Sequence, residues 1–142
     1  MKKLIPSLLS LLTLSLVTAC GGGASSAAGV YHLDTAPFRE RMAAEMKGVP
    51  EAEVKKQLDA MVGNMSGSID LKADGSASIK LHMMMMNEEA TGTWKLDGAT
   101  LSITAKGKDG KEETKTAKFA DGAITIEEQE GKEKMQMVFR RK

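Results

Sequence analysis

Residues 90–105 read ATGTWKLDGATLSITA, and this stretch decides the fold. On each side of Asp97-Gly98, apolar and polar residues alternate. The apolar positions are Ala90, Gly92, Trp94 and Leu96 before the turn and Ala99, Leu101, Ile103 and Ala105 after it. A period of two is typical of a half-buried strand, and Asp-Gly between two such segments is a strong signal for a β-hairpin. The stretch therefore predicts two antiparallel strands that share one apolar face.

The same pattern continues in both directions from this hairpin. Further turn signals stand at Asp74-Gly75, Asp109-Gly110, Asp121-Gly122 and Glu130-Gly131. Residues 66–142 therefore predict seven antiparallel strands, and residues 29–33 predict one more near the start. A sheet of about eight strands with one apolar face must curl, close or be covered. We expect a mainly β fold, an antiparallel up-and-down meander that closes into a small barrel with its first strand beside its last.

Two short helices are expected between the first and second strands. Thr35 can cap a helix that holds Pro37 in its first turn, because threonine and proline are favoured at those positions. Pro50 opens the second helix. The apolar residues at helical spacing are Phe38, Met42 and Met46 in the first helix and Val54, Leu58, Met61, Val62 and Met65 in the second. Both stripes predict amphipathic helices whose methionines face the core.

The first 19 residues have the composition of a signal peptide. Lys2 and Lys3 give a positive start, and the uncharged, leucine-rich segment 4–17 follows. A membrane-spanning helix needs about 20 apolar residues, so this segment is too short to span and suits a signal-peptide core. We therefore expect export, with removal of residues 1–19.

The end of this segment, Val17-Thr18-Ala19-Cys20, resembles the lipobox of bacterial lipoproteins. That resemblance implies that Cys20 is acylated, with palmitate as an expected chain, and that it anchors the mature protein to a membrane. Gly21 follows instead of Asp, which by the same resemblance implies the outer membrane. The alternative is an ordinary secretory signal that happens to contain a cysteine. In the lipoprotein interpretation, residues 20–28 form the lipidated cysteine and a flexible tether of Gly, Ala and Ser, and residues 29–142 form the barrel domain.

The order of one strand, two helices and a long meander resembles the lipocalin and fatty-acid-binding superfamily. Gly92-Thr93-Trp94 also resembles the Gly-x-Trp motif of lipocalins. It falls in the middle of the meander, however, and Gly29-Val30-Tyr31 stands on the first strand, where the family carries its motif. The resemblance implies a lipocalin-like barrel with an internal ligand site.

Composition and motifs exclude several classes of function. The net charge is only +1, so no strong field favours nucleic acid. The single cysteine excludes an internal disulfide framework and a cysteine-based zinc site. The sequence has two histidines but neither a Gly-x-Ser-x-Gly motif nor a Gly-rich phosphate loop, so we expect neither an enzyme nor a cofactor. The charged segments 106–113 and 127–133 are typical of solvated turns.

The first function hypothesis is a non-enzymatic binding module for an apolar small molecule or a lipid. It expects a cavity inside the barrel, lined by apolar residues from several strands. The candidate ligand-binding residues are Ile79, Leu81, Trp94, Leu101, Ile103, Met135 and Met137. Nothing in the sequence identifies the ligand or a protein partner.

The four-methionine run 83–86 leaves further interpretations open. In a strand, His82, Met84 and Met86 would project to one face, and these soft ligands could hold Cu(I) or Ag(I). The other interpretation is packing: aromatic residues make up only 4%, so methionines must fill the core, with the helix pair covering Met84 and Met86. A third function hypothesis is a structural or partner-binding surface lipoprotein.

Overall fold

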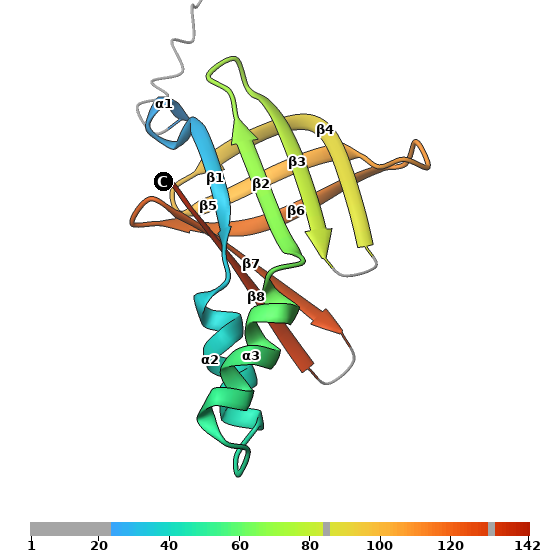
Figure 1. Ribbon diagram of the computed structural model, residues 1–142. Coiled ribbons are helices and arrows are strands. Elements are labelled where there is room, and N and C mark those ends of the chain that lie inside the picture. The colour runs from blue at the N-terminus through green and yellow to red at the C-terminus, as the bar shows by residue number, and fades with distance from the viewer. Residues whose placement is uncertain (1–23, 84–85, 131–132) are drawn as a thin grey trace, which may run out of the picture.

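The computed structural model describes residues 24–83, 86–130 and 133–142, which form eight strands and three helices (Figure 1). The elements in chain order are α1 (Ala24–Ala27), β1 (Gly29–Asp34), α2 (Ala36–Glu45), α3 (Glu51–Val62), β2 (Met65–Leu71), β3 (Ser76–Met83), β4 (Met86–Asp97), β5 (Thr100–Lys106), β6 (Glu112–Ala120), β7 (Ala123–Glu130) and β8 (Glu133–Arg140).

The strands form a closed barrel in which each strand pairs with the next and β1 pairs with β8, always antiparallel. Helices α2 and α3 lie between β1 and β2. The predicted fold class is therefore confirmed, including the pairing of the first strand with the last.

Glycines in the hairpin turns help to fix the register of the paired strands. Gly75, Gly98, Gly110 and Gly122 all have a positive φ, a conformation that glycine adopts without a steric penalty in tight hairpins.

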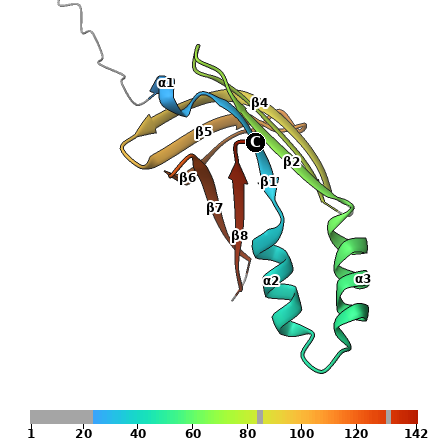
Figure 2. The ribbon, with the colours of Figure 1, turned by 60° about the vertical axis from the view of Figure 1, so that its left-hand side comes forward.

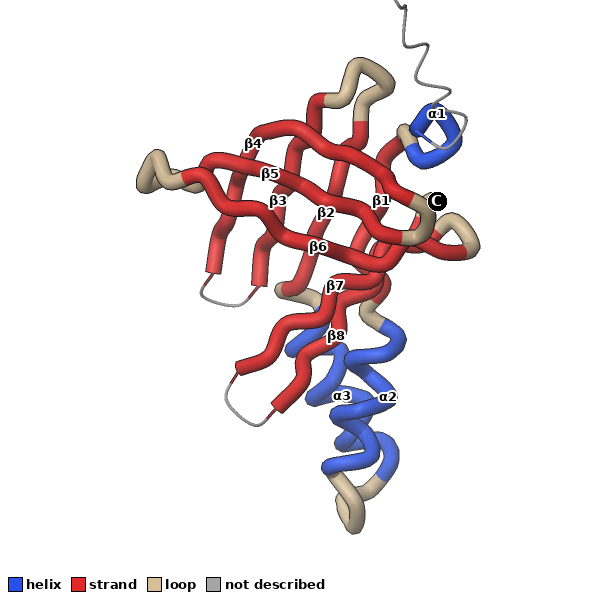
Figure 3. The backbone as a smooth tube through the Cα atoms, turned by 180° about the vertical axis from the view of Figure 1, so that it is seen from behind, coloured by secondary structure: helices blue, strands red, loops and turns tan. Residues whose placement is uncertain are grey.

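The barrel closes through two short seams. Strands β6 and β7 share only three residue pairs, from Lys118↔Thr125 to Ala120↔Ala123. Strands β1 and β8 also share three, from His32↔Arg140 to Asp34↔Val138. Strands β7 and β8 pair along their whole length, so the outer half of their hairpin leaves the barrel wall (Figures 1 and 3). Over residues 112–117, β6 therefore pairs with β5 along one edge, and its other edge has no strand partner among the described residues.

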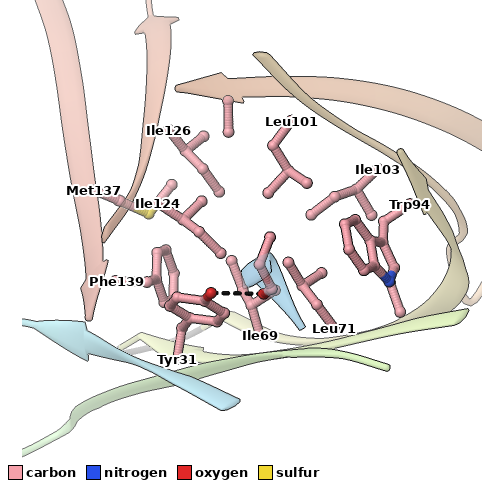
Figure 4. Close-up of a cluster of buried hydrophobic side chains, with 13 residues drawn as sticks. Tyr31, Ile69, Leu71, Trp94, Leu101, Ile103, Ile124, Ile126, Met137 and Phe139 are labelled. Atoms are coloured by element: carbon pink, nitrogen blue, oxygen red, sulfur yellow. Dashed lines mark hydrogen bonds between the residues drawn. The ribbon is translucent and has the colours of Figure 1, made fainter. Parts of the chain in front are cut away.

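The core fills the closed part of the barrel with branched aliphatic and aromatic side chains (Figure 4). Tyr31 and Phe139 are its largest fully buried members. The Tyr31 hydroxyl donates to the carbonyl of Ala27 at 2.6 Å, and the Trp94 indole N–H donates to the carbonyl of Lys72 at 2.8 Å. No polar or charged residue is buried among the described residues. The interior is therefore apolar, and its two polar aromatic groups have partners.

The segment before β1 differs from the flexible tether that its composition predicts. Residues Ala24–Ala27 form the short helix α1, and Ala27 is fully buried beside Tyr31. Arg141 holds this segment from the other end of the chain. Its guanidinium donates to the carbonyls of Ser26 and Ala28, each at 2.6 Å, and lies 5.1 Å from the centre of the Tyr31 ring. The flexible tether expected over residues 20–28 is therefore wrong for residues 26–28, because Ala27 is buried and Arg141 binds the carbonyls on either side of it. Residues 20–23 lie outside the described residues.

The helix pair extends beyond the barrel (Figure 2). The expected packing of its methionines on Met84 and Met86 involves side chains outside the described residues, so that cover stays a prediction. Helix α2 contacts α3 and β8, and it has no buried residue. In α3 only Leu58 and Val62 are buried. The methionines of the two stripes are all half-buried: Met42, Met46, Met61 and Met65. Core positions for these four methionines were wrong, because the two helices extend beyond the barrel and leave part of each methionine exposed to solvent.

The start of α2 is capped by Asp34 and not by Thr35. Thr35 makes no side-chain capping bond. Instead the Asp34 carboxylate accepts from the backbone N–H of Ala36 at 3.0 Å and from Arg140 Nε at 2.9 Å. The hydrogen bond from Ala36 is the main cause that holds the pKa of Asp34 below its ordinary value of 3.8; burial opposes it, and the hydrogen bond and charge of Arg140 lower the pKa further. One carboxylate thus joins β1, α2 and β8.

Gly92 lies where β4 passes from one neighbour to the other. Residues Thr91–Thr93 pair with both β3 and β5. A Cβ at Gly92 would lie 1.8 Å from the carbonyl oxygen of Thr104 and 2.6 Å from Ala105 Cα. Only glycine allows this close approach of two backbones, which is typical of a corner in a barrel wall.

We expect Gly92→Ala to lower the free energy of unfolding by about 3 kcal/mol, because the added methyl meets rigid backbone. Gly107→Ala is the control, since its Cβ would meet only the flexible Asp109 carboxylate at 3.1 Å. Urea denaturation of both variants measures the effect. Equal stability of the two variants would contradict the corner assigned to Gly92.

We expect Asp34→Asn to lower the free energy of unfolding by about 0.5–1 kcal/mol at pH 6, the range for a solvent-screened ion pair. A carboxylate whose folded pKa is lowered stabilises the fold above its unfolded pKa, and this stabilisation is lost as the pH falls. The difference between wild type and variant should therefore shrink as the pH falls below 3.8 and vanish below the lowered pKa of the folded protein. Denaturation curves across this range, with Asp97→Asn as the exposed control, measure it. A difference that does not change with pH would refute the ion-pair explanation.

Candidate functional site

A cavity of about 450 Å³ lies inside the barrel wall, between β3, β4 and β5 on one side and β6, β7 and β8 on the other. Its apolar lining is Ile79, Leu81, Ala90, Ile103, Ala105, Ile126 and Met137. These side chains come from the inward-facing positions of the alternating pattern, so the pattern that predicts the strands also produces the lining. The volume is within the range of small-molecule sites.

The structure brings four of the seven candidate ligand-binding residues together in this lining: Ile79, Leu81, Ile103 and Met137. Trp94 and Leu101 belong to the buried cluster of the core and do not line the cavity (Figure 4). Met135 is 37% exposed, because it lies on the part of β8 that has left the barrel wall. Ile126 was missed, although it alternates with Ile124 on the strand before the last turn.

Charged residues form the mouth of the cavity. They are Glu88, Glu89, Lys108, Asp109, Lys111, Glu113, Lys115 and Glu128. Sequence reasoning interpreted most of these residues as parts of solvated turns. Their side chains are indeed largely exposed, but the ends of β4, β5, β6 and β7 bring them around one opening. The order of the hairpins could have predicted this gathering of charges, since alternate turns of a meander lie at the same end of a barrel.

An ion pair crosses the seam where β6 and β7 no longer pair. Lys115 Nζ lies 2.6 Å from Glu128 Oε1, and both side chains are about half exposed. The hydrogen bond to Glu128 raises the pKa of Lys115 above its ordinary value of 10.5, with a smaller opposing effect of burial and further support from the charges of Glu88 and Glu113. Lys115 is therefore a lysine surrounded by carboxylates.

The Cu(I) or Ag(I) site expected from His82, Met84 and Met86 lies partly outside the described residues and stays a prediction. His82 is exposed, and its ring Nδ1 contacts the side-chain oxygen of Asn87. Met84 lies outside the described residues, and of Met86 only the backbone is described, which pairs with Met83. Within the described ranges no group of three or more His, Cys, Asp or Glu side chains is placed to hold a metal ion.

Cys20 and the expected signal peptide also lie outside the described residues, so the expected lipidation stays a prediction. Among the helices in the described part of the chain, none has the length and apolar character needed to cross a membrane.

No protein-family model and no curated protein matches this sequence. Among solved structures, the chain is similar to the REP1-NXSQ fatty acid transporter, with 18% identity and a TM-score of 0.41 over 82% of this chain and 96% of the transporter. It is also similar to a fatty-acid-binding protein from brain tissue of Drosophila melanogaster, with 18% identity and a TM-score of 0.37 over 80% and 97% of the two chains. At these values neither likeness identifies a ligand for this chain.

Proposed function

We propose that this chain is an exported lipoprotein, acylated at Cys20 and held at the outer membrane, whose barrel is a non-enzymatic binding module for an apolar small molecule or a lipid. The observation that carries the binding function is the cavity of about 450 Å³ with an apolar lining inside the barrel. The lipobox-like residues 17–20 support the anchor.

The cavity suits an alkyl chain better than a polar ligand. Its deep side chains, such as Ile103, Ile126 and Met137, offer no hydrogen-bonding group of their own. Each methylene that leaves water for such a lining contributes about 0.8 kcal/mol. A polar ligand would instead lose its bonds to water without replacement, which costs more than it gains.

Met137 gives the lining some adaptability. A methionine side chain is unbranched and polarisable, so it fits ligands of different shape at little cost. Ala90 and Ala105, on neighbouring strands, keep the cavity open because their side chains are small. The site therefore selects apolar ligands as a class and accepts ligands of different shape.

Binding can be tested with N-phenyl-naphthylamine, a neutral apolar dye that fluoresces strongly when it leaves water. The closed barrel and its core lie within residues 24–142, so the chain from residue 20 with Cys20→Ser is suitable. We expect saturable dye binding, and at least a tenfold loss of affinity in Ala90→Phe, whose ring would occupy the cavity. Fluorescence titration measures both.

The control is Ala99→Phe, which adds the same ring in the exposed turn between β4 and β5. It should bind the dye as the parent does, and thermal melts should show both phenylalanine variants folded. Absence of saturable binding in the folded parent would refute the binding function.

Anchoring can be tested in a bacterial host with two membranes that expresses the full chain and its Cys20→Ser variant. We expect the wild type to incorporate an alkynyl fatty acid and to sediment with outer membranes, because several acyl chains hold a protein almost permanently. The variant should lose the label. A wild-type chain that is secreted in soluble form without label would contradict the anchor and support an ordinary secretory signal.

A further inference from the structure

The mouth of the cavity has an excess of negative charge. Of the charged residues around it, five are carboxylates and three are lysines. Lys115 is bonded to Glu128, and Lys111 lies 4.0 Å from Asp109. Lys108 donates to the backbone carbonyl of Asn87 at 3.4 Å. Two of the three lysines therefore have carboxylate partners, and Lys108 is bonded to a neutral carbonyl.

Three carboxylates around the same opening have no ion pair within the described part of the chain: Glu88, Glu89 and Glu113. They approach from two sides, since Glu88 and Glu89 belong to β4 and Glu113 to β6. Two of them, Glu88 and Glu113, contribute to the raised pKa of Lys115, so both carboxylates lie close enough to interact with the same ammonium group. The field at the mouth is therefore that of unneutralised carboxylates.

The interior offers nothing that would hold an anion. No charged or polar residue is buried in the described core. The two polar groups of the buried aromatic residues already donate, Tyr31 to Ala27 and Trp94 to Lys72. A ligand that carries a negative head group would find no free donor deep in the cavity, so its head would have to stay at the mouth.

At the mouth an anionic head meets repulsion. Its available cation there is Lys108, which donates to a neutral carbonyl, and it would meet the unpaired carboxylates of Glu88 and Glu113 at the same opening. To reach Lys115 it would have to displace Glu128 and leave that carboxylate unpaired. The negative head group and these carboxylates repel one another, and the low polarity of the cavity wall strengthens the repulsion. A cationic head gains from the same carboxylates and displaces nothing.

We infer that the cavity binds an apolar chain with a cationic head group, such as an alkylammonium, and discriminates against fatty-acid carboxylates. The chain lies against Ile103, Ile126 and Met137, and the head lies between Glu88 and Glu113, whose register partners Leu81 and Ala105 line the cavity. This inference rests on the proposed binding function and specifies its ligand class.

The test uses three probes that share one alkyl chain: decyltrimethylammonium, decanol and decanoate, each below its micelle concentration. Their affinities follow from displacement of N-phenyl-naphthylamine at pH 7 and low salt. We expect the cation to bind about tenfold more tightly than the carboxylate, with the alcohol between them. Because salt screens exposed charges, about 0.5 M sodium chloride should narrow this difference.

A double variant, Glu88→Gln with Glu113→Gln, keeps the shape of the mouth and removes two charges. It should lower the affinity for decyltrimethylammonium several-fold and leave that for decanol unchanged. The matched control is Glu51→Gln with Glu53→Gln, which removes the same charge from α3, outside the cavity lining. This control should leave both affinities unchanged.

The outcomes separate the two proposals. If the dye and all three probes fail to bind the folded protein, the binding function fails. If decanoate binds as tightly as the cation or more tightly, or if the double variant behaves as the control does, the binding function stands and the cationic ligand class is overturned. Thermal melts with each probe show whether the protein stays folded during the measurement.

Discussion

Closure of a one-faced sheet through two seams of three residue pairs is the constraint on which the rest of the structure depends. The apolar face has to be removed from water, and the strands achieve this only where they pair around the full circle. Beyond the seams, the β7–β8 hairpin follows its own pairing and leaves the wall (Figure 3). The closed part then forms the core, and the parted strands form the site. Lys115 and Glu128 bridge the separation with a polar contact that needs no strand pairing.

The cavity follows from the composition of the chain. Aromatic residues make up only 4% of the sequence, and two of them, Tyr31 and Phe119, meet edge-on at 6.2 Å. The other half of the barrel is lined by aliphatic residues, Met137 and two alanines, which leave space unfilled. A barrel with bulkier residues at the alanine positions would pack to the usual density. The same side chains thus determine where the protein is solid and where it can hold a ligand.

The sequence was enough to predict the fold because strand periodicity and Asp-Gly turns are local signals. It was also enough for four cavity-lining residues, since inward-facing positions on successive strands meet inside a barrel. The sequence did not predict the burial of residues whose contacts come from parts of the chain far away in sequence. Ala27 has no periodic pattern around it, so its burial follows only from the Arg141 and Tyr31 contacts. Met135 shares its strand face with Met137, but the hairpin has left the wall at that point.

The two ends of the barrel have different roles. The turns after β2, β4 and β6 share one end with α1, which Arg141 holds closed (Figure 1). The turn after β5 lies at the other end, where the charged mouth opens. If Cys20 carries the lipid, the four-residue step to Ala24 spans at most about 14 Å, so the closed end must lie near the bilayer. The mouth then faces away from the anchoring membrane, and a ligand would come from the surrounding aqueous compartment. A site placed this way favours an amphiphile with measurable solubility in water, which a charged head group provides.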